Sequence, residues 1–226
     1  MSDGPAAEAL KLAQLPLFPL QTVLFPGGWL PLRIFEVRYL DMIGRCHKAG
    51  APFGVVSLSE GSEVRRPDPK APPGGDGFAK EDFHPIGVLA RIESLEKPQP
   101  GLYMIRCQGL QRFNVTRRTR LPHGLWVADV ELLPADLPAP VPDELASVAT
   151  GLKRVLENLR ERQPGAEDQL PIQPPYHWDD AGWVANRWCE LVPAPLALKQ
   201  RLMALDNPLL RLELVADLLD KLGLDR

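Results

Sequence analysis

The alternation of apolar and polar residues divides the chain into a front part with strand-like runs and a back part with helical periodicity. In the run 30–34 every second residue is a leucine or isoleucine, the pattern of a half-buried strand. Pro31 within this run indicates an edge strand or a bulge, because proline donates no backbone hydrogen bond. Apolar residues then recur every three positions from Glu36 to about His47, which predicts a short helix that ends at Gly50.

Five further runs have the composition of strands. The run 126–133 is the clearest, because its even-numbered residues are apolar while Asp129 and Glu131 lie between them. Gly109 separates two of the runs and is predicted to form a hairpin turn. The predicted strands span residues 53–58, 86–95, 102–108, 111–116 and 126–133.

From Asp143 onward the apolar residues recur every three to four positions, which predicts four amphipathic helices. The last helix is the best marked, since Asn207 can cap it, Pro208 suits its first turn and Gly223 can end it. Four such helices joined by short proline-containing segments form a small bundle. The helices are expected near residues 143–159, 179–191, 195–205 and 207–222.

Clusters of proline mark the boundaries of the predicted parts. Proline makes up 25 of the 226 residues, about twice its average share. We predict a flexible N-terminus over residues 1–14, a β part over 15–140 and a helical part over 141–226. The segment 59–84 is rich in proline, glycine and charge, so we predict a mobile surface loop that is either a passive insertion or a lid over a binding site.

Composition and charge narrow the class of protein. Lysine and arginine total 26 against 29 aspartate and glutamate, and the net charge of −3 gives no general attraction to nucleic acid or membranes. The N-terminus lacks the basic segment and apolar stretch of a secretory signal, and no apolar run is long enough to cross a bilayer. Together with three widely spaced cysteines, these features predict a reduced, cytoplasmic protein.

No catalytic or phosphate-binding motif is found in the sequence. The patterns G-x-x-x-x-G-K-[ST], G-x-S-x-G, H-E-x-x-H and G-x-G-x-x-G do not occur. The four histidines are widely spread, and the adjacent Cys46 and His47 are expected to be a buried thiol beside an exposed imidazole. We therefore expect a protein that is not an enzyme and that uses no cofactor or metal ion.

Several motifs near the N-terminus occur in one order and with close spacing. They are LPLFPL, a following LFPG turn, the PLRIFE strand and an RYLDMI helix, all within residues 15–43. This segment strongly resembles the opening of the Lon protease N-terminal domain, the substrate-binding domain at the front of ATP-dependent Lon proteases. The resemblance covers about residues 15–222. The later segments that fit are FGVV (53–56), IGVLARI (86–92), GLQRF (109–113), LALKQRL (196–202) and LDNPLLRL (205–212).

The resemblance implies an α+β fold, in which a PUA-like mixed β barrel with a short helix is followed by a C-terminal helical bundle. It also implies a non-catalytic domain that binds exposed or unfolded polypeptide segments, or a partner protein, in a cleft between barrel and bundle. A full Lon protease continues into ATPase and serine–lysine protease modules, whereas this chain ends at Arg226. We therefore expect a stand-alone Lon-domain protein without ATP-dependent peptidase activity. A separate Lon-type protease is among the partners considered, and the sequence leaves self-association open.

The candidate binding residues are aromatic or lie in the first turn of the short helix. Trp29 follows two glycines in a predicted turn, where its large ring either contacts a ligand or plugs the barrel. Residues 36–39 are explained either by a cap, a salt bridge and packing on the barrel, or by ligand contact. The aromatic group at 176–188 either joins the bundle to the barrel or lines a ligand groove. The polypeptide-binding candidates are Trp29, Phe35, Glu36, Arg38, Tyr39, Tyr176, Trp178 and Trp183.

RNA binding is the alternative function. Four arginines lie within nine residues at the end of a predicted strand, and PUA-like folds include RNA-binding modules. The chain is acidic overall, and Phe113 beside the cluster is expected inside the protein, so a solvated strand end is the simpler interpretation. The alternative RNA-binding residues are Arg112, Arg117, Arg118 and Arg120.

Overall fold

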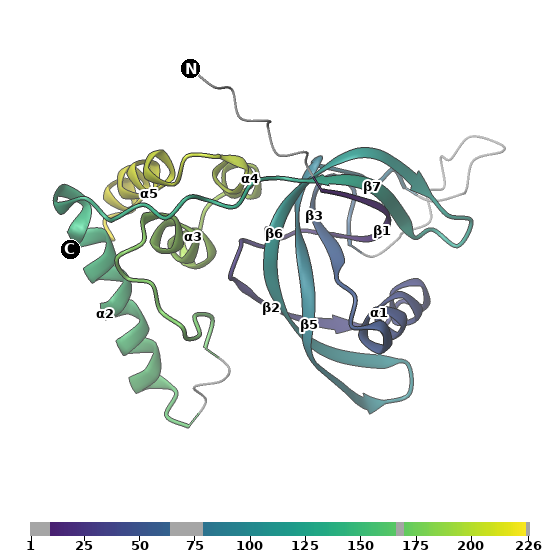
Figure 1. Cartoon of the computed structure of the whole chain (residues 1–226). Helices are drawn as coiled ribbons and strands as arrows, with labels where there is room; N and C mark the ends of the chain where they lie inside the picture. Colours follow the sequence, from purple (N-terminus) through teal and green to yellow (C-terminus); the bar gives the residue numbers. More distant parts are fainter. Residues whose placement is uncertain (1–9, 64–78, 166–169, 225–226) are drawn as a thin grey trace, which may run out of the picture.

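The chain folds as a mixed α+β protein, with the strands in its first part and most of the helices in its second (Figure 1). The computed structural model describes residues 10–63, 79–165 and 170–224. Most of the predicted flexible N-terminus and of the predicted loop 59–84 lies outside the described residues. The strands are β1 (Lys11–Leu20), β2 (Trp29–Ile34), β3 (Phe53–Glu60), β4 (Asp82–Phe83), β5 (Ile86–Gln99), β6 (Leu102–Arg120) and β7 (Trp126–Leu132).

The strands form one sheet whose pairings return to their starting strand. The order is β1-β7-β6-β5-β3-β4, and β1 also pairs with β3 in parallel, so that β1, β7, β6, β5 and β3 form a closed circuit. The other pairings are antiparallel. Within the described residues β2 pairs with β6 alone, which agrees with the edge position predicted from Pro31.

The hairpin turn predicted at Gly109 is wrong, because β6 runs without interruption from Leu102 to Arg120. Gly109 instead lies where the turn before β2 crosses β6. Its N–H donates to the carbonyl oxygen of Gly28 and its own carbonyl accepts from the N–H of Gly27, both at 2.8 Å. A Cβ at residue 109 would collide with the carbonyl oxygen of Phe25, so glycine here permits a close approach of two backbones.

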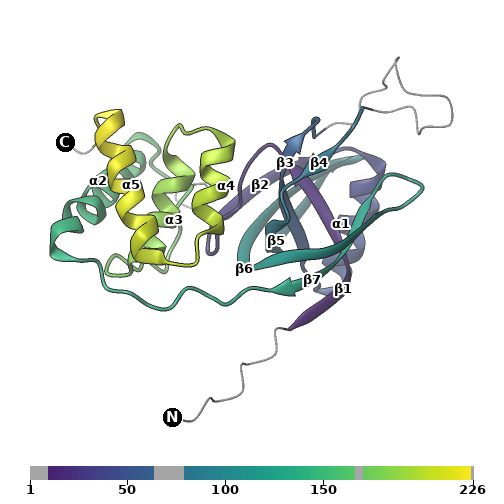
Figure 2. The same cartoon turned by 90° about the horizontal axis from the view of Figure 1, so that it is seen from above.

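Helix α1 (Val37–Ala49) covers one side of the sheet (Figure 2). Tyr39 is buried and stacks on Phe18 of β1, with ring centroids 4.0 Å apart. The helix ends at Gly50, whose left-handed φ of 60° fits the predicted stop. Cys46 is buried and His47 is exposed, as expected.

Four further helices follow a 3-10 turn (η1, Asp143–Leu145). They are α2 (Ala146–Arg162), α3 (Ala181–Leu191), α4 (Leu196–Ala204) and α5 (Pro208–Leu222). The predicted caps of the last helix are confirmed, because Asn207 Oδ1 accepts from the N–H groups of Leu209 and Leu210, and Gly223 adopts a φ of 66°. Asp180 caps α3 in the same way by accepting from the N–H of Trp183.

The elements form two lobes, seen side by side in Figure 2. We call β1–β7 with α1 the sheet lobe, and α2–α5 the helical lobe. A buried apolar cluster contains residues of both lobes, including Phe25 of the sheet lobe and Trp188 of α3. An extended connection over residues 133–142 leaves β7 and runs along the N-terminal end of α3, where Pro140 and Asp180 form a β-bridge. The lobes are therefore joined by packing as well as by the chain.

Candidate functional site

A groove of about 660 Å³ lies between the two lobes, and we call it the interlobe groove. The extended connection forms one wall, and the start of α3 with the segment before it forms another. The sheet lobe contributes the turn before β2 and part of β6. Its lining residues are Pro26, Gly27, Leu110, Gln111, Arg112, Pro134, Ala135, Asp136, Pro138, Ala139, Pro140, His177, Asp179, Asp180, Gly182, Trp183 and Asn186.

Backbone hydrogen bonds hold the extended connection against α3. The N–H of Val141 donates to the carbonyl of Asp179 at 2.9 Å, and the N–H of Ala181 donates to the carbonyl of Ala139 at 2.8 Å. Asp180 Oδ2 also accepts from the N–H of Ala139 at 3.3 Å. These bonds fix the wall of the groove to the helix it faces.

Two buried arginines meet one aspartate where the lobes join. Arg112 of β6 donates through Nη1 to the carbonyl oxygens of Met203 (3.3 Å) and Leu205 (2.8 Å), and its Nη2 lies 3.3 Å from Asp136 Oδ1. Arg211 of α5 also donates to Asp136, from the other lobe. Charged groups at such a joint need these partners, because an unpaired buried charge is costly. Arg112 is 3% exposed, so its prediction as part of a surface basic cluster is wrong.

A second joint places α3 against the turn before β2. Arg187 Nη2 donates to the carbonyl of Pro26 at 2.8 Å and to Glu190 Oε1 at 2.9 Å. Glu190 Oε2 is buried and accepts no hydrogen bond within the described structure. Burial raises the pKa of Glu190 to about 7, although Arg187 and Lys199 oppose the shift. Burial disfavours the charged form of Lys199 on α4 as well, which lowers the pKa of this lysine.

This second joint could not be predicted from the sequence. Arg187 and Glu190 are separated from Pro26 by more than 160 residues, and no local pattern connects them. The adjacent Gly27 and Gly28 indicate that another segment approaches this turn closely, but they do not identify that segment.

Of the predicted aromatic binding residues, Trp183 lines the interlobe groove. Tyr176 and Trp178 stack at 5.1 Å between ring centroids and contact α2 through Arg160 and Lys153. Trp188 lies inside the helical lobe, where its Nε1 donates to the carbonyl of Val148 at 2.9 Å. Trp188 also belongs to the buried apolar cluster that contains residues of both lobes.

The predicted residues near α1 divide between two other places. Phe35, Glu36 and Tyr39 line a second groove of about 320 Å³ beside β2, and the Phe35 side chain is 57% exposed. Arg38 is buried, donates to Glu36 Oε2 at 3.0 Å and to the carbonyl of Gly124 at 2.8 Å. The Glu36 side chain makes this salt bridge and does not cap the helix.

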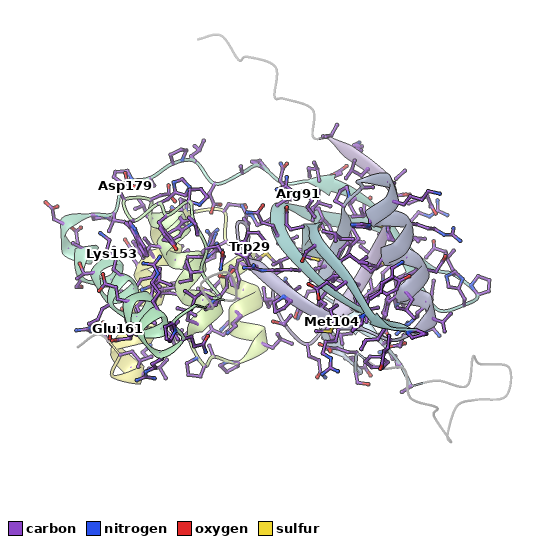
Figure 3. The ribbon with its side chains drawn as sticks, turned by 90° about the horizontal axis from the view of Figure 1, so that it is seen from below. Trp29, Arg91, Met104, Lys153, Glu161 and Asp179 are labelled. Carbon is purple, nitrogen blue, oxygen red and sulfur yellow. The ribbon has the colours of Figure 1, made fainter. Side chains whose placement is uncertain are left out.

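Trp29 lies on the side of the sheet lobe that faces the helical lobe (Figure 3). Its side chain is half-buried. The guanidinium of Arg106 lies over the Trp29 ring, 4.3 Å from the ring centroid. Trp29 therefore does not plug the interior of the sheet. The predicted binding residues do not converge on one site.

The remaining arginines of the predicted basic cluster lie at the other end of β6. Arg118 pairs with Asp82 at 2.6 Å and lies over the ring of Phe83, and Arg120 lies over the ring of Trp126. The hydrogen bond from Arg118 holds the pKa of Asp82 below its usual value. Arg117 and Arg118 are exposed, whereas Arg112 is buried. The four arginines therefore do not form one basic patch on the surface.

The described residues 10–63, 79–165 and 170–224 contain no group of three or more histidine, cysteine, aspartate or glutamate residues placed to hold a metal ion. No helix among them has both the length and the apolar character needed to cross a membrane.

The chain thus combines a mostly antiparallel sheet lobe, a helical lobe and a mostly apolar groove between them. The family model of the ATP-dependent protease La (LON) substrate-binding domain matches residues 14–221. The chain belongs to this family, and the resemblance drawn from residues 15–43 is confirmed.

Known relatives show how much of a longer protein the chain matches. It is 30% identical over 135 residues to Lon protease 4 of Sorangium cellulosum, which is 59% of this chain and 15% of that protein. It is 25% identical over 221 residues to a Lon protease of Xanthomonas oryzae pv. oryzae, which is 97% of this chain and 24% of that protein. The chain spans about a quarter or less of the length of these curated relatives.

Two solved structures support the fold. A crystal structure of a Lon N-terminal domain protein from Xanthomonas campestris matches with a TM-score of 0.67 and 30% identity, over 91% of this chain and 98% of that one. The N-terminal domain of a Mycobacterium avium complex Lon protease matches with a TM-score of 0.53 and 17% identity, over 90% of this chain and 96% of that one.

Proposed function

We propose that the chain binds exposed or unfolded polypeptide segments, or a partner protein, and that the interlobe groove holds them. Membership in the Lon substrate-binding family supports a substrate-binding role. The interlobe groove supports this location for the binding site, because it is a mostly apolar hollow of about 660 Å³ between the two lobes.

The groove has the chemistry that an apolar polypeptide segment needs. Leu110, Trp183 and the prolines of the extended connection offer apolar contacts, and burial of such side chains favours binding by roughly 25 cal/mol per Å². Asp179 and His177 are exposed at its edge and can contact polar groups of the segment. The buried Arg112 is occupied by carbonyl oxygens and Asp136, so we assign it a structural role.

We also propose a finer description of the fold, a cellular setting and a partner. The closed circuit of strands supports a PUA-like barrel, and the packing of α2–α5 supports a helical bundle, with the boundary between the two parts near residue 141. Three free, buried cysteines support a reducing, cytoplasmic setting. A separate Lon-type protease is the partner protein that family membership favours.

We propose no catalytic role. The segment that matches the Lon proteases is their substrate-binding domain, and the activity in their name is a property of those longer proteins. RNA binding is not proposed, since Arg112 is buried and Arg118 is paired with Asp82.

The test compares two variants of the extended connection. Ala135 and Leu137 are both exposed, but only Ala135 lines the interlobe groove. Fluorescence anisotropy with labelled, unfolded casein should show that Ala135→Trp weakens binding about tenfold or more by filling the groove, while Leu137→Trp binds like the wild type. Equal binding by both variants would exclude the groove, and no binding by the wild type would exclude the function. A labelled single-stranded RNA serves as the comparison ligand, and salt-sensitive RNA binding that Arg117→Ala weakens would support the alternative instead.

A further inference from the structure

The interlobe groove carries an uneven set of charges. Its charged lining residues are Asp136, Asp179 and Asp180 against Arg112, with histidine counted as neutral. The extended connection over residues 133–142 and the segment 177–186 form two of its walls, and neither contains a lysine or an arginine. Which of these charges can act on an occupant depends on the partners that each already has.

The charges of Arg112 and Asp136 are balanced where the lobes join. Asp136 pairs with Arg112 at 3.3 Å and with Arg211 of α5. The Nη2 atom of Arg112 also lies 3.1 Å from Asp206 Oδ1. Two arginines thus meet two aspartates, and this part of the groove presents no net charge to an occupant.

Asp180 is engaged by the backbone around it. Its Oδ1 accepts from the N–H of Trp183 at 2.6 Å, and its Oδ2 accepts from the N–H of Ala139 at 3.3 Å. Its negative charge also faces the positive end of the α3 dipole, which would otherwise attract an anion. The start of α3 is therefore compensated and does not favour an acidic occupant.

Asp179 is the lining residue whose charge no described residue compensates. Its side chain is exposed and makes no hydrogen bond or ion pair with any described residue. Its backbone is held in place, because its carbonyl oxygen accepts from the N–H of Val141 at 2.9 Å. Asp179 lies on the helical lobe beside the extended connection (Figure 3). It lines the same groove as Trp183 and Leu110, so a free carboxylate borders an apolar surface.

We propose that the interlobe groove prefers polypeptide segments in which apolar residues flank a lysine or an arginine, whose charged head pairs with Asp179. This preference rests on the proposed function and names the class of segment that the groove selects. Lysine and arginine suit both parts of the surface, since their stems pack on apolar side chains such as Trp183 while their heads stay at the wet edge. A glutamate or aspartate at the same place in the segment would be repelled by the Asp179 carboxylate.

Fluorescence anisotropy with three labelled peptides tests the preference. The peptides share the same leucine, alanine and proline residues and differ at one central position, which is lysine, norleucine or glutamate. At low salt the lysine peptide should bind about threefold more tightly than the norleucine peptide, and the glutamate peptide about threefold more weakly. These differences should disappear at about 1 M salt, where the Debye length is about 3 Å.

Variants at Asp179 assign the preference to this residue. Asp179→Asn should remove the difference between the lysine and norleucine peptides, and Asp179→Lys should reverse the order, so that the glutamate peptide binds more tightly than the lysine peptide. Asp217→Lys is the matched control, because it makes the same change in net charge at an exposed aspartate of α5 that does not line the interlobe groove. This control should keep the wild-type order. Circular dichroism of each variant shows that it is folded.

The outcomes separate the preference from the proposed function. Equal binding of the three peptides by the wild type, with all of them weakened by Ala135→Trp, would overturn the preference and leave the function standing. The preference is also overturned if Asp179→Lys keeps the wild-type order, or if Asp217→Lys reverses it. If the wild type binds neither the peptides nor labelled casein, the proposed function fails and the preference fails with it.

Discussion

The carboxylate of Glu190 on α3 occupies the space beside Gly28 that a side chain on residue 28 would fill. In that position Glu190 accepts a hydrogen bond from Arg187, which also donates to the carbonyl of Pro26. The turn before β2 and the third helix are therefore fitted to each other, and the lack of a side chain at Gly28 is what lets the lobes come together.

Replacing Gly28 by alanine should loosen this joint. The added methyl would displace the Glu190 carboxylate from Arg187 and approach the Phe25 carbonyl oxygen at 3.0 Å. We expect a loss of about 1 to 3 kcal/mol in the free energy of unfolding, measured by urea denaturation. Gly44→Ala is the matched control, because a Cβ there meets only the Tyr103 ring at 3.9 Å and lies within α1. That variant should be unchanged or more stable.

Glu190 should make stability depend on pH near neutrality. Its pKa is about 7 in the folded chain, against an ordinary value of 4.5. As pH rises from about 4.5 to 7, the unfolded chain loses this proton before the folded chain does, so the free energy of unfolding falls, by about 3 kcal/mol at most. The charged groups facing Glu190 are Arg187 from its own helix and Lys199 from α4, and the turn at residues 26–28 carries none.

Glu190→Gln isolates that contribution. Glutamine keeps the oxygen that accepts from Arg187 but does not ionise, so the variant should lose less stability than the wild type between pH 5 and pH 8 when urea curves are compared. Parallel pH profiles for the two proteins would contradict the assignment of this dependence to Glu190.

Arg112→Met should destabilise the chain by about 3 to 5 kcal/mol, because it removes a buried charge that satisfies Asp136 and the carbonyl oxygens of Met203 and Leu205. Arg117→Met, the same change at an exposed position on the same strand, should alter stability by about 0.5 kcal/mol or less. Urea denaturation of both variants measures the difference, and similar losses would argue against the structural role of Arg112.

The three cysteines should resist thiol reagents in the folded chain. Burial raises the pKa of Cys107 and of Cys189 to about 12 and raises the pKa of Cys46, so the reactive thiolate is scarce as well as shielded. An Ellman titration at pH 8 should show slow or no reaction of the native protein and reaction of all three thiols in urea. Rapid native labelling of any one of them would contradict this burial.

Elements with local signals could be predicted from the sequence. The cap at Asn207, the stop at Gly223 and the alternation in β7 depend on residues within one or two turns of each other, and each prediction agrees with the structure. The Lon resemblance was equally accessible, because LPLFPL and PLRIFE are contiguous motifs. Local sequence therefore predicted most helices, most strands and the family.

Features that depend on distant contacts could not be predicted. Gly109 has the sequence signature of a turn, but its role is to let residues 27 and 28 cross β6. Arg112 reads as part of a basic cluster with Arg117 and Arg118, and only the position of α4 and α5 shows that it is buried. The interlobe groove is formed by segments far apart in the chain, and no pattern within any one of them reveals it.

The proline content of the extended connection has a consequence for how the interlobe groove is maintained. Pro134, Pro138 and Pro140 each have a fixed φ, so this wall keeps its shape without any occupant and loses little freedom when one arrives. The same residues donate no backbone hydrogen bonds and offer only carbonyl oxygens, which reduces the chance that the wall recruits a neighbouring strand. The extended connection therefore joins the two lobes and also forms a rigid wall of the groove that disfavours pairing with a neighbouring strand.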